Sequence, residues 1–123
     1  MVDDDTDDQQ IFSLAIQAID PTLSVVFATN GGDALKQLQD MARPDVIFLD
    51  YQMPGMDGIE CLTKLKAVRS TRQIPVIMYT GSDSKAEKQL AIRLGAFEFM
   101  GKSKHVDQLT SEIGKIISLL NKV

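Results

Sequence analysis

Short apolar blocks alternate with amphipathic stretches along the whole chain. Four blocks are rich in β-branched and aromatic residues, and they predict strands that are covered on both faces. The blocks span residues 24–29, 46–50, 75–80 and 97–101. The stretches between them carry apolar residues on one helical face. This alternation predicts one α/β domain, in which a doubly wound parallel sheet has helices on both faces.

Five amphipathic segments are predicted helices, and three of them follow capping boxes, in which two side chains three positions apart cap the helix start. The boxes pair Thr6 with Gln9, Asp57 with Glu60, and Ser84 with Glu87. Gly95 is expected to end the fourth helix, because glycine is favoured just after a helix C-terminus. The second helix covers about residues 33–41, and the last follows His105.

The start of the chain is short for this architecture. Only Met1 and Val2 precede a run of acidic residues, which leaves too few residues for a first strand. In a doubly wound sheet this strand would be central, and without it backbone groups and apolar surface would stay unpaired. We therefore expect a truncated first strand that lacks about four residues before Met1, and a sheet that does not close without them.

Composition narrows the class of protein. A length of 123 residues indicates a single domain over residues 1–123. One cysteine excludes an internal disulfide and a cysteine-rich zinc site. The apolar runs are too short for a membrane span or a signal peptide, so we expect a cytoplasmic protein with no membrane partner. Residues 1–60 carry 12 acidic and 2 basic side chains, and residues 61–123 carry 5 acidic and 11 basic ones. No concentrated basic face is evident, so no nucleic-acid partner is expected.

Polar residues follow the predicted strands where each strand ends. Asp3 and Asp4 follow the short first strand, and Asp50 and Thr80 end the strands at 46–50 and 75–80. Lys102 follows the strand at 97–101. The carboxyl ends of parallel strands meet at one edge. At ~5 Å and an effective dielectric constant of ~20, each pair of carboxylates there repels by about 3 kcal/mol. Such a cluster needs either a cation or raised carboxylate pKa values. Oxygen ligands with room for water suit Mg²⁺. A metal, an ammonium group and a hydroxyl together suit a phosphoryl group on a carboxylate.

Four motifs in order carry a resemblance to a known family. They are VDDD at 2–5, PDVIFLDYQMPGMDGIE at 44–60, PVIMYTGSD at 75–83 and GAFEFMGKS at 95–103. The chain resembles the receiver domain of two-component response regulators, the CheY-like superfamily. The resemblance implies a flavodoxin-like, five-stranded parallel sheet with strand order 2-1-3-4-5 and five helices.

The resemblance also assigns roles around the phosphorylation site. Asp50 corresponds to the phosphoacceptor, which takes a phosphoryl group from a histidine kinase. Asp3 and Asp4 correspond to the acidic pair that binds Mg²⁺ with Asp50, and the backbone carbonyl of Gln52 completes the metal site. The side chains of Gln52 and Ser82 are expected to flank the attacking water and to tune the lifetime of the acyl phosphate without changing Mg²⁺ affinity.

The same resemblance places a switch further along the chain. Thr80 corresponds to the hydroxyl that moves to the phosphoryl group, and Phe99 to the aromatic ring that turns inward with it. Lys102 corresponds to the basic residue that bonds the acyl phosphate. The family usually has proline after this lysine, but Ser103 stands there. We expect a trans peptide bond at this position, because a cis bond before a residue other than proline is costly.

The remaining acidic residues of the first segment have a simpler interpretation. Asp7 and Asp8 are expected to be solvated at a helix N-terminus, where the helix dipole favours negative charge. For Asp5 the sequence leaves open whether it belongs to the metal site or to the helix start.

These features predict a phosphorylation-driven switch that is not an enzyme beyond its own phosphotransfer and dephosphorylation. Its expected partners are a sensor histidine kinase or a phosphotransfer protein, and a downstream protein. The chain is expected to carry no output domain and to signal through the fourth helix, the strand at 97–101 and the last helix. This face includes several basic residues, namely Lys85, Lys88, Arg93, Lys104 and Lys115.

Three other classes of protein fit the sequence less well. A pseudo-receiver, which binds proteins without being phosphorylated, has support only from Ser103. A haloacid-dehalogenase-type phosphatase would need a second aspartate where Gln52 stands, and no cap domain fits in this length. A flavodoxin-type cofactor binder would need a loop rich in hydroxyl groups after the first strand, whereas this loop is rich in carboxylates, which repel phosphate.

Overall fold

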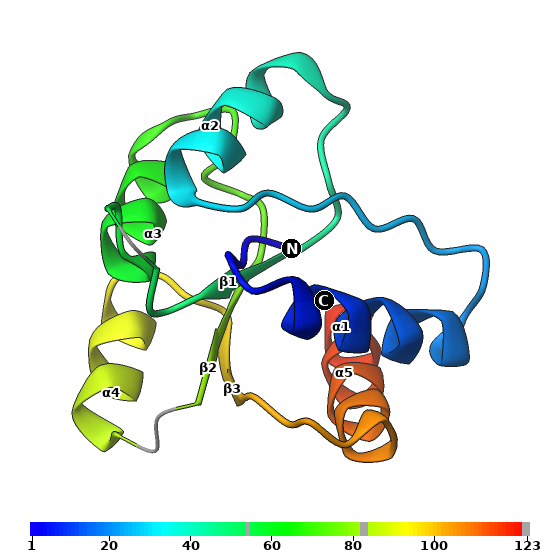
Figure 1. Cartoon of the computed structure of the whole chain (residues 1–123). Coiled ribbons are helices and arrows are strands. Elements are labelled where there is room, and N and C mark those ends of the chain that lie inside the picture. Colours follow the sequence, from blue (N-terminus) through cyan, green and yellow to red (C-terminus); the bar gives the residue numbers. More distant parts are fainter. Residues whose placement is uncertain (54, 82–83, 122–123) are drawn as a thin grey trace.

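The computed structural model describes residues 1–53, 55–81 and 84–121, which form a parallel sheet between two layers of helices (Figure 1). The helices are α1 (Thr6–Ile19), α2 (Gly31–Asp40), α3 (Gly58–Ala67), α4 (Lys85–Arg93) and α5 (Val106–Leu120), and the strands are β1 (Ile47–Asp50), β2 (Val76–Thr80) and β3 (Glu98–Gly101). The strands are parallel in the order β1-β2-β3. Among the described residues, no helix combines the length and the apolar character needed to cross a membrane.

The alternation of side chains along the strands builds two separate cores. On one face, α1 and α5 pack together against Phe48, Ile77 and Tyr79. On the other face, α2, α3 and α4 cover Leu49 and Met78. All nine residues of β1 and β2 are buried. This explains why the strands appear in the sequence as continuous apolar runs instead of alternating patterns.

Two predicted helix starts and one predicted helix end are confirmed. The side chain of Asp57 accepts a hydrogen bond of 2.8 Å from the backbone N–H of Glu60 at the start of α3. Ser84 accepts one of 3.2 Å from the N–H of Glu87 at the start of α4. Gly95 follows α4 with a φ of 110°, a conformation that favours glycine.

The predicted cap of the first helix is wrong by one residue. The N-cap of α1 is Asp5, whose side chain accepts hydrogen bonds from the N–H groups of Asp7 and Asp8. Thr6 is already the first helical residue, and the amide of Gln9 donates to the carbonyl of Asp3 instead of closing a box. Asp5 therefore belongs to the helix start, which resolves the choice that the sequence left open.

The predicted strand at residues 24–29 does not form. Val2 makes single bridges to Ala28 on one side and to Leu49 on the other. The backbone pairing with Ala28 is limited to the neighbours of Val2, for example the 2.9 Å hydrogen bond from the Ala28 N–H to the Met1 carbonyl. A strand forms only where a neighbouring segment pairs with it over several residues. The first two residues of the chain are too few to do so. The lateral order agrees with 2-1-3-4-5, but the described residues contain three strands and two bridges.

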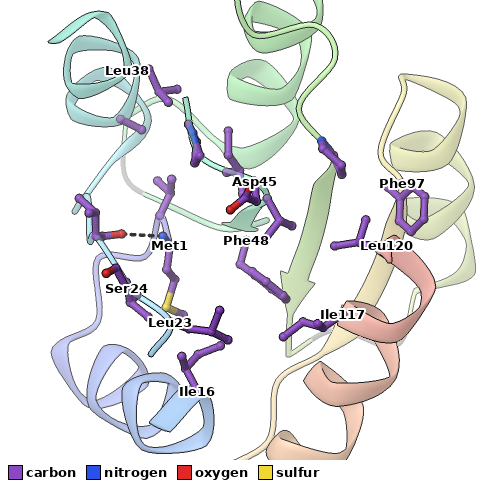
Figure 2. Close-up of a pocket in the computed structure, with 18 of the residues that line it drawn as sticks. Met1, Ile16, Leu23, Ser24, Leu38, Asp45, Phe48, Phe97, Ile117 and Leu120 are labelled. Atoms are coloured by element: carbon purple, nitrogen blue, oxygen red, sulfur yellow. Dashed lines mark hydrogen bonds between the residues drawn. The ribbon is translucent and has the colours of Figure 1, made fainter. Parts of the chain in front are cut away.

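A groove lies next to Met1 and Val2, between the segment before Ala28 and β1. It has a volume of about 1410 Å³ and is lined mainly by apolar side chains from α1, the segment before Ala28, β1 and the end of α5. Figure 2 shows Met1, Leu23 and Phe48 among the residues that line the groove. The Met1 ammonium donates a hydrogen bond of 2.8 Å to the carbonyl of Val26, and burial lowers its pKa to about 6. The central position of the sheet is thus only partly filled.

Candidate functional site

The predicted site residues converge at the carboxyl edge of the sheet. Asp50 ends β1, Thr80 ends β2, and both residues are only 2% exposed. Asp3 is fully buried beside them, whereas Asp4 is exposed. One carboxylate oxygen from each of Asp3, Asp4 and Asp50 lies within 4.8 Å of the others. The prediction of a carboxylate cluster at this edge is therefore confirmed.

The ammonium group of Lys102 lies among three carboxylates. Its Nζ is 2.7 Å from Asp8 Oδ2, 3.2 Å from Asp3 Oδ2 and 3.2 Å from Asp50 Oδ2. The backbone N–H of Lys102 donates a hydrogen bond of 2.6 Å to the carbonyl of Thr80, which fixes the residue against β2. Burial favours the neutral amine, but the hydrogen bond to Asp8 and the charges of Asp3 and Asp50 outweigh it and raise the pKa. Lys102 is therefore a fixed positive charge.

Burial disfavours the charged forms of Asp3 and Asp50. Burial is the main cause of the raised pKa of Asp3, about 7, against the opposing effects of the Asp5 N–H and of Lys102. Burial also raises the pKa of Asp50. Oδ1 of Asp3 accepts a hydrogen bond of 2.9 Å from the Asp5 N–H. Its Oδ2 is buried without a hydrogen-bond donor among the described residues, although Lys102 lies 3.2 Å away.

This arrangement fits a hard divalent cation. The available donors are carboxylate oxygens, and the exposed Asp4 leaves one side open to water, as Mg²⁺ requires. A cation there would offset the repulsion among the carboxylates and would be coordinated by Oδ2 of Asp3, which has no hydrogen-bond donor among the described residues. The backbone N–H of Gln52 donates a hydrogen bond of 3.2 Å to Asp50 Oδ1. Gln52 itself is exposed. The roles of its carbonyl as a ligand and of its side chain in tuning stay predictions.

The two residues predicted to act as a switch lie on neighbouring strands. Thr80 is buried at the end of β2, and Phe99 is half-buried on β3. The ring of Phe99 meets that of Tyr51 edge-on, with 6.4 Å between the centroids. The predicted movement of the switch is untested, and Ser82 lies outside the described residues. The Lys102–Ser103 peptide bond is trans, as expected.

Gly58 lets the start of α3 approach the loop that follows Asp50. Its N–H donates a hydrogen bond of 2.9 Å to the carbonyl of Tyr51. A Cβ at this position would collide with the carbonyl of Asp50 and would lie 2.7 Å from the Cα of Tyr51. The last glycine of the MPGMDG segment, Gly58, is therefore required by this close approach.

The expectation that Asp8 is solvated is wrong. Asp8 is only 8% exposed, and it makes the shortest of the three contacts with Lys102. A signal for this was present in the sequence, because Asp8 lies four residues before Phe12, and residues at this spacing share a helix face. Asp7 is exposed, as expected.

Removing the charge of Asp3 is expected to make stability less dependent on pH. The folded protein holds a proton on Asp3 up to a pKa of about 7, whereas the unfolded chain releases it near the ordinary aspartate pKa of 3.8. Between these values the folded state binds more protons, so the wild type loses stability as the pH rises. In urea unfolding without divalent cations, the free energy of unfolding of Asp3→Asn should therefore rise relative to that of the wild type between pH 4 and 7. A constant difference over this range would contradict the assignment.

Comparison with known sequences identifies the family. The family model described as the response regulator receiver domain matches residues 1–114. The cyclic di-GMP phosphodiesterase response regulator RpfG of Xanthomonas campestris pv. campestris (strain 8004) is 31% identical over 121 residues, which are 97% of this chain and 31% of that protein. The chain spans less than half the length of the curated relatives named by the search.

Solved structures agree with the sequence comparison. The phosphorylated cyanobacterial phytochrome response regulator RcpA superposes with a TM-score of 0.84 at 26% identity, over 94% of this chain and 86% of that chain. The Mn²⁺-bound form of response regulator Rcp1 gives a TM-score of 0.79 at 25% identity, over 99% of this chain and 93% of that chain. With its fold and the match over residues 1–114, the chain belongs to the response regulator receiver domain family.

Proposed function

We propose that the chain is the phosphoacceptor switch of a two-component system, in which Asp50 takes a phosphoryl group from a histidine of a sensor kinase or a phosphotransfer protein. The observation that carries this proposal is the surroundings of Asp50. Its buried carboxylate has an ammonium group at 3.2 Å and two further carboxylates that can hold a cation with it. The phosphorylated form of RcpA and the Mn²⁺-bound form of Rcp1 support it by similarity.

The proposed transfer uses the charges at the edge of the sheet. A carboxylate oxygen of Asp50 forms a bond to phosphorus while the P–N bond of the donor phosphohistidine breaks. The electron pair of that bond stays on the imidazole nitrogen, which takes up a proton. Lys102 stabilises the negative charge on the phosphoryl oxygens, and Thr80 donates a hydrogen bond to one of them. Mg²⁺ held by Asp3, Asp4 and Asp50 would supply further charge stabilisation.

The proposed output is a change in a surface formed by α4, β3 and α5. Phosphorylation of Asp50 favours the conformer in which Thr80 and Phe99 lie closer to the site, and this shifts the population of the adjoining surface. The basic side chains on this surface are all exposed, namely Lys85, Lys88, Arg93, Lys104 and Lys115. A downstream protein with an acidic contact face would suit it.

Intact-protein mass after incubation with acetyl phosphate tests the proposal. We expect the mass of one phosphoryl group to be gained only with Mg²⁺, and Asp50→Asn to gain none. Equal gain in Asp50→Asn, or in the presence of EDTA, would contradict the role of Asp50 or of the metal. No gain together with no Mg²⁺ binding would instead indicate a pseudo-receiver.

A further inference from the structure

Asp8 reaches the site from a different element than the other acidic residues. It lies in the first turn of α1, whereas Asp50 ends a strand of the sheet and Asp3 follows the bridge residue Val2. Its carboxylate is nearly buried and contacts Lys102 at 2.7 Å. The three-carboxylate cluster that could hold a cation does not include Asp8. Asp8 is thus an anionic partner of Lys102 outside the cation site.

The other two partners of Lys102 are shared. Oδ2 of Asp3 and Oδ2 of Asp50 both lie 3.2 Å from its ammonium group, and both carboxylates also belong to the cation cluster. A divalent cation bound to these carboxylates repels the ammonium group and competes for the same negative charge. Lys102 then needs another partner if it is to stay at the site.

Packing holds Asp8 in place for this role. Its N–H donates to the capping side chain of Asp5, at 3.3 Å. One turn later, Phe12 is buried against Phe48 and Tyr79 of the sheet. The carboxylate is therefore carried by a helix whose start is capped by Asp5 and whose apolar face packs against the sheet.

We propose that Asp8 is a positioning residue that retains the Lys102 ammonium group at the site while Asp3 and Asp50 bind a divalent cation. This inference rests on the proposed function, because it assigns Asp8 to the same cation-dependent site. Asp8 offsets the charge of Lys102 so that the cation does not have to displace a buried ion pair. Without it, the ammonium group is balanced only by the carboxylates that the cation needs.

Calorimetric titration with Mg²⁺ tests this role without relying on phosphorylation. We expect Asp8→Asn to bind Mg²⁺ roughly tenfold more weakly than the wild type, the size of effect seen when a supporting partner of a metal site is lost. Asp7→Asn is the matched control, because it removes the same charge from an exposed position in the same helical turn. We expect its affinity to stay at the wild-type value. Equal weakening in both variants would overturn the proposal, because it would indicate a general effect of charge.

A double-mutant cycle shows whether Asp8 acts through Lys102. In a Lys102→Met background, Asp8→Asn should no longer weaken Mg²⁺ binding, and an effect that persists would overturn the proposal. Thermal unfolding in EDTA verifies that each variant is folded. A wild type that binds Mg²⁺ as tightly as Asp8→Asn would overturn only the role of Asp8. A wild type that binds no Mg²⁺ would overturn the cation-dependent function as well.

Discussion

Lys102→Met is expected to lower the free energy of unfolding by about 3 kcal/mol at pH 8 without divalent cations, because it leaves buried carboxylates without their counter-charge. Asp3, Asp8 and Asp50 all lie within 3.2 Å of the ammonium group that is removed. Methionine preserves much of the unbranched side chain, so the change in packing is small. Urea unfolding measures the effect. The same variant should also lose phosphorylation by acetyl phosphate.

Two conditions should restore part of this loss. Mg²⁺ supplies positive charge to the same carboxylates, and protonation of Asp3, whose pKa is raised to about 7, removes one of the negative charges. The deficit of Lys102→Met should therefore shrink with added Mg²⁺ and at pH 5. Lys104→Met is the control, because Lys104 is exposed nearby and is expected to change stability little. A deficit that is independent of Mg²⁺ and pH would show that Lys102 acts through packing alone.

Four apolar residues added before Met1, for example Val-Ile-Leu-Val after a new initiator methionine, are expected to raise the free energy of unfolding by about 3 kcal/mol. Each buried apolar side chain contributes ~1.5–3 kcal/mol, and ordering each residue costs ~1–2 kcal/mol. The groove of about 1410 Å³ beyond Met1 offers the space. The extension also replaces the Met1 ammonium group, whose pKa burial lowers to about 6, by a neutral amide. Urea unfolding of both chains measures the gain.

An extension of the same length made of glycine and serine is the control. It also converts the ammonium group of Met1 into an amide, but it brings no apolar side chains into the groove. We expect it to give only a small part of the gain. Equal stabilisation by both extensions would show that the groove does not accept a strand, and that only the charge of the N-terminus matters.

Local sequence patterns were enough to predict the edge of the sheet and most of the site. Residues 46–49 and 76–79 are uninterrupted apolar runs, and such runs predict parallel strands buried on both faces. The chemistry follows from this, because the carboxyl ends of parallel strands meet at one edge. The positions of Asp50, Thr80 and Lys102 are thus set by local pattern and general topology. The caps formed by Asp57 and Ser84 were predictable for the same reason, since a cap depends on neighbours a few residues away.

Features that depend on partners far apart in the sequence could be seen only in the folded chain. The apolar run at 24–29 predicted a strand, but a strand exists only where another segment lies beside it, and Met1 and Val2 reach only as far as Ala28. Asp8 and Lys102 are 94 residues apart in the sequence and meet because the start of α1 and the residue after β3 lie at the same edge of the sheet. Local propensity contains no information about such a meeting. Burial and long-range packing turned a predicted surface aspartate into a partner of the central lysine.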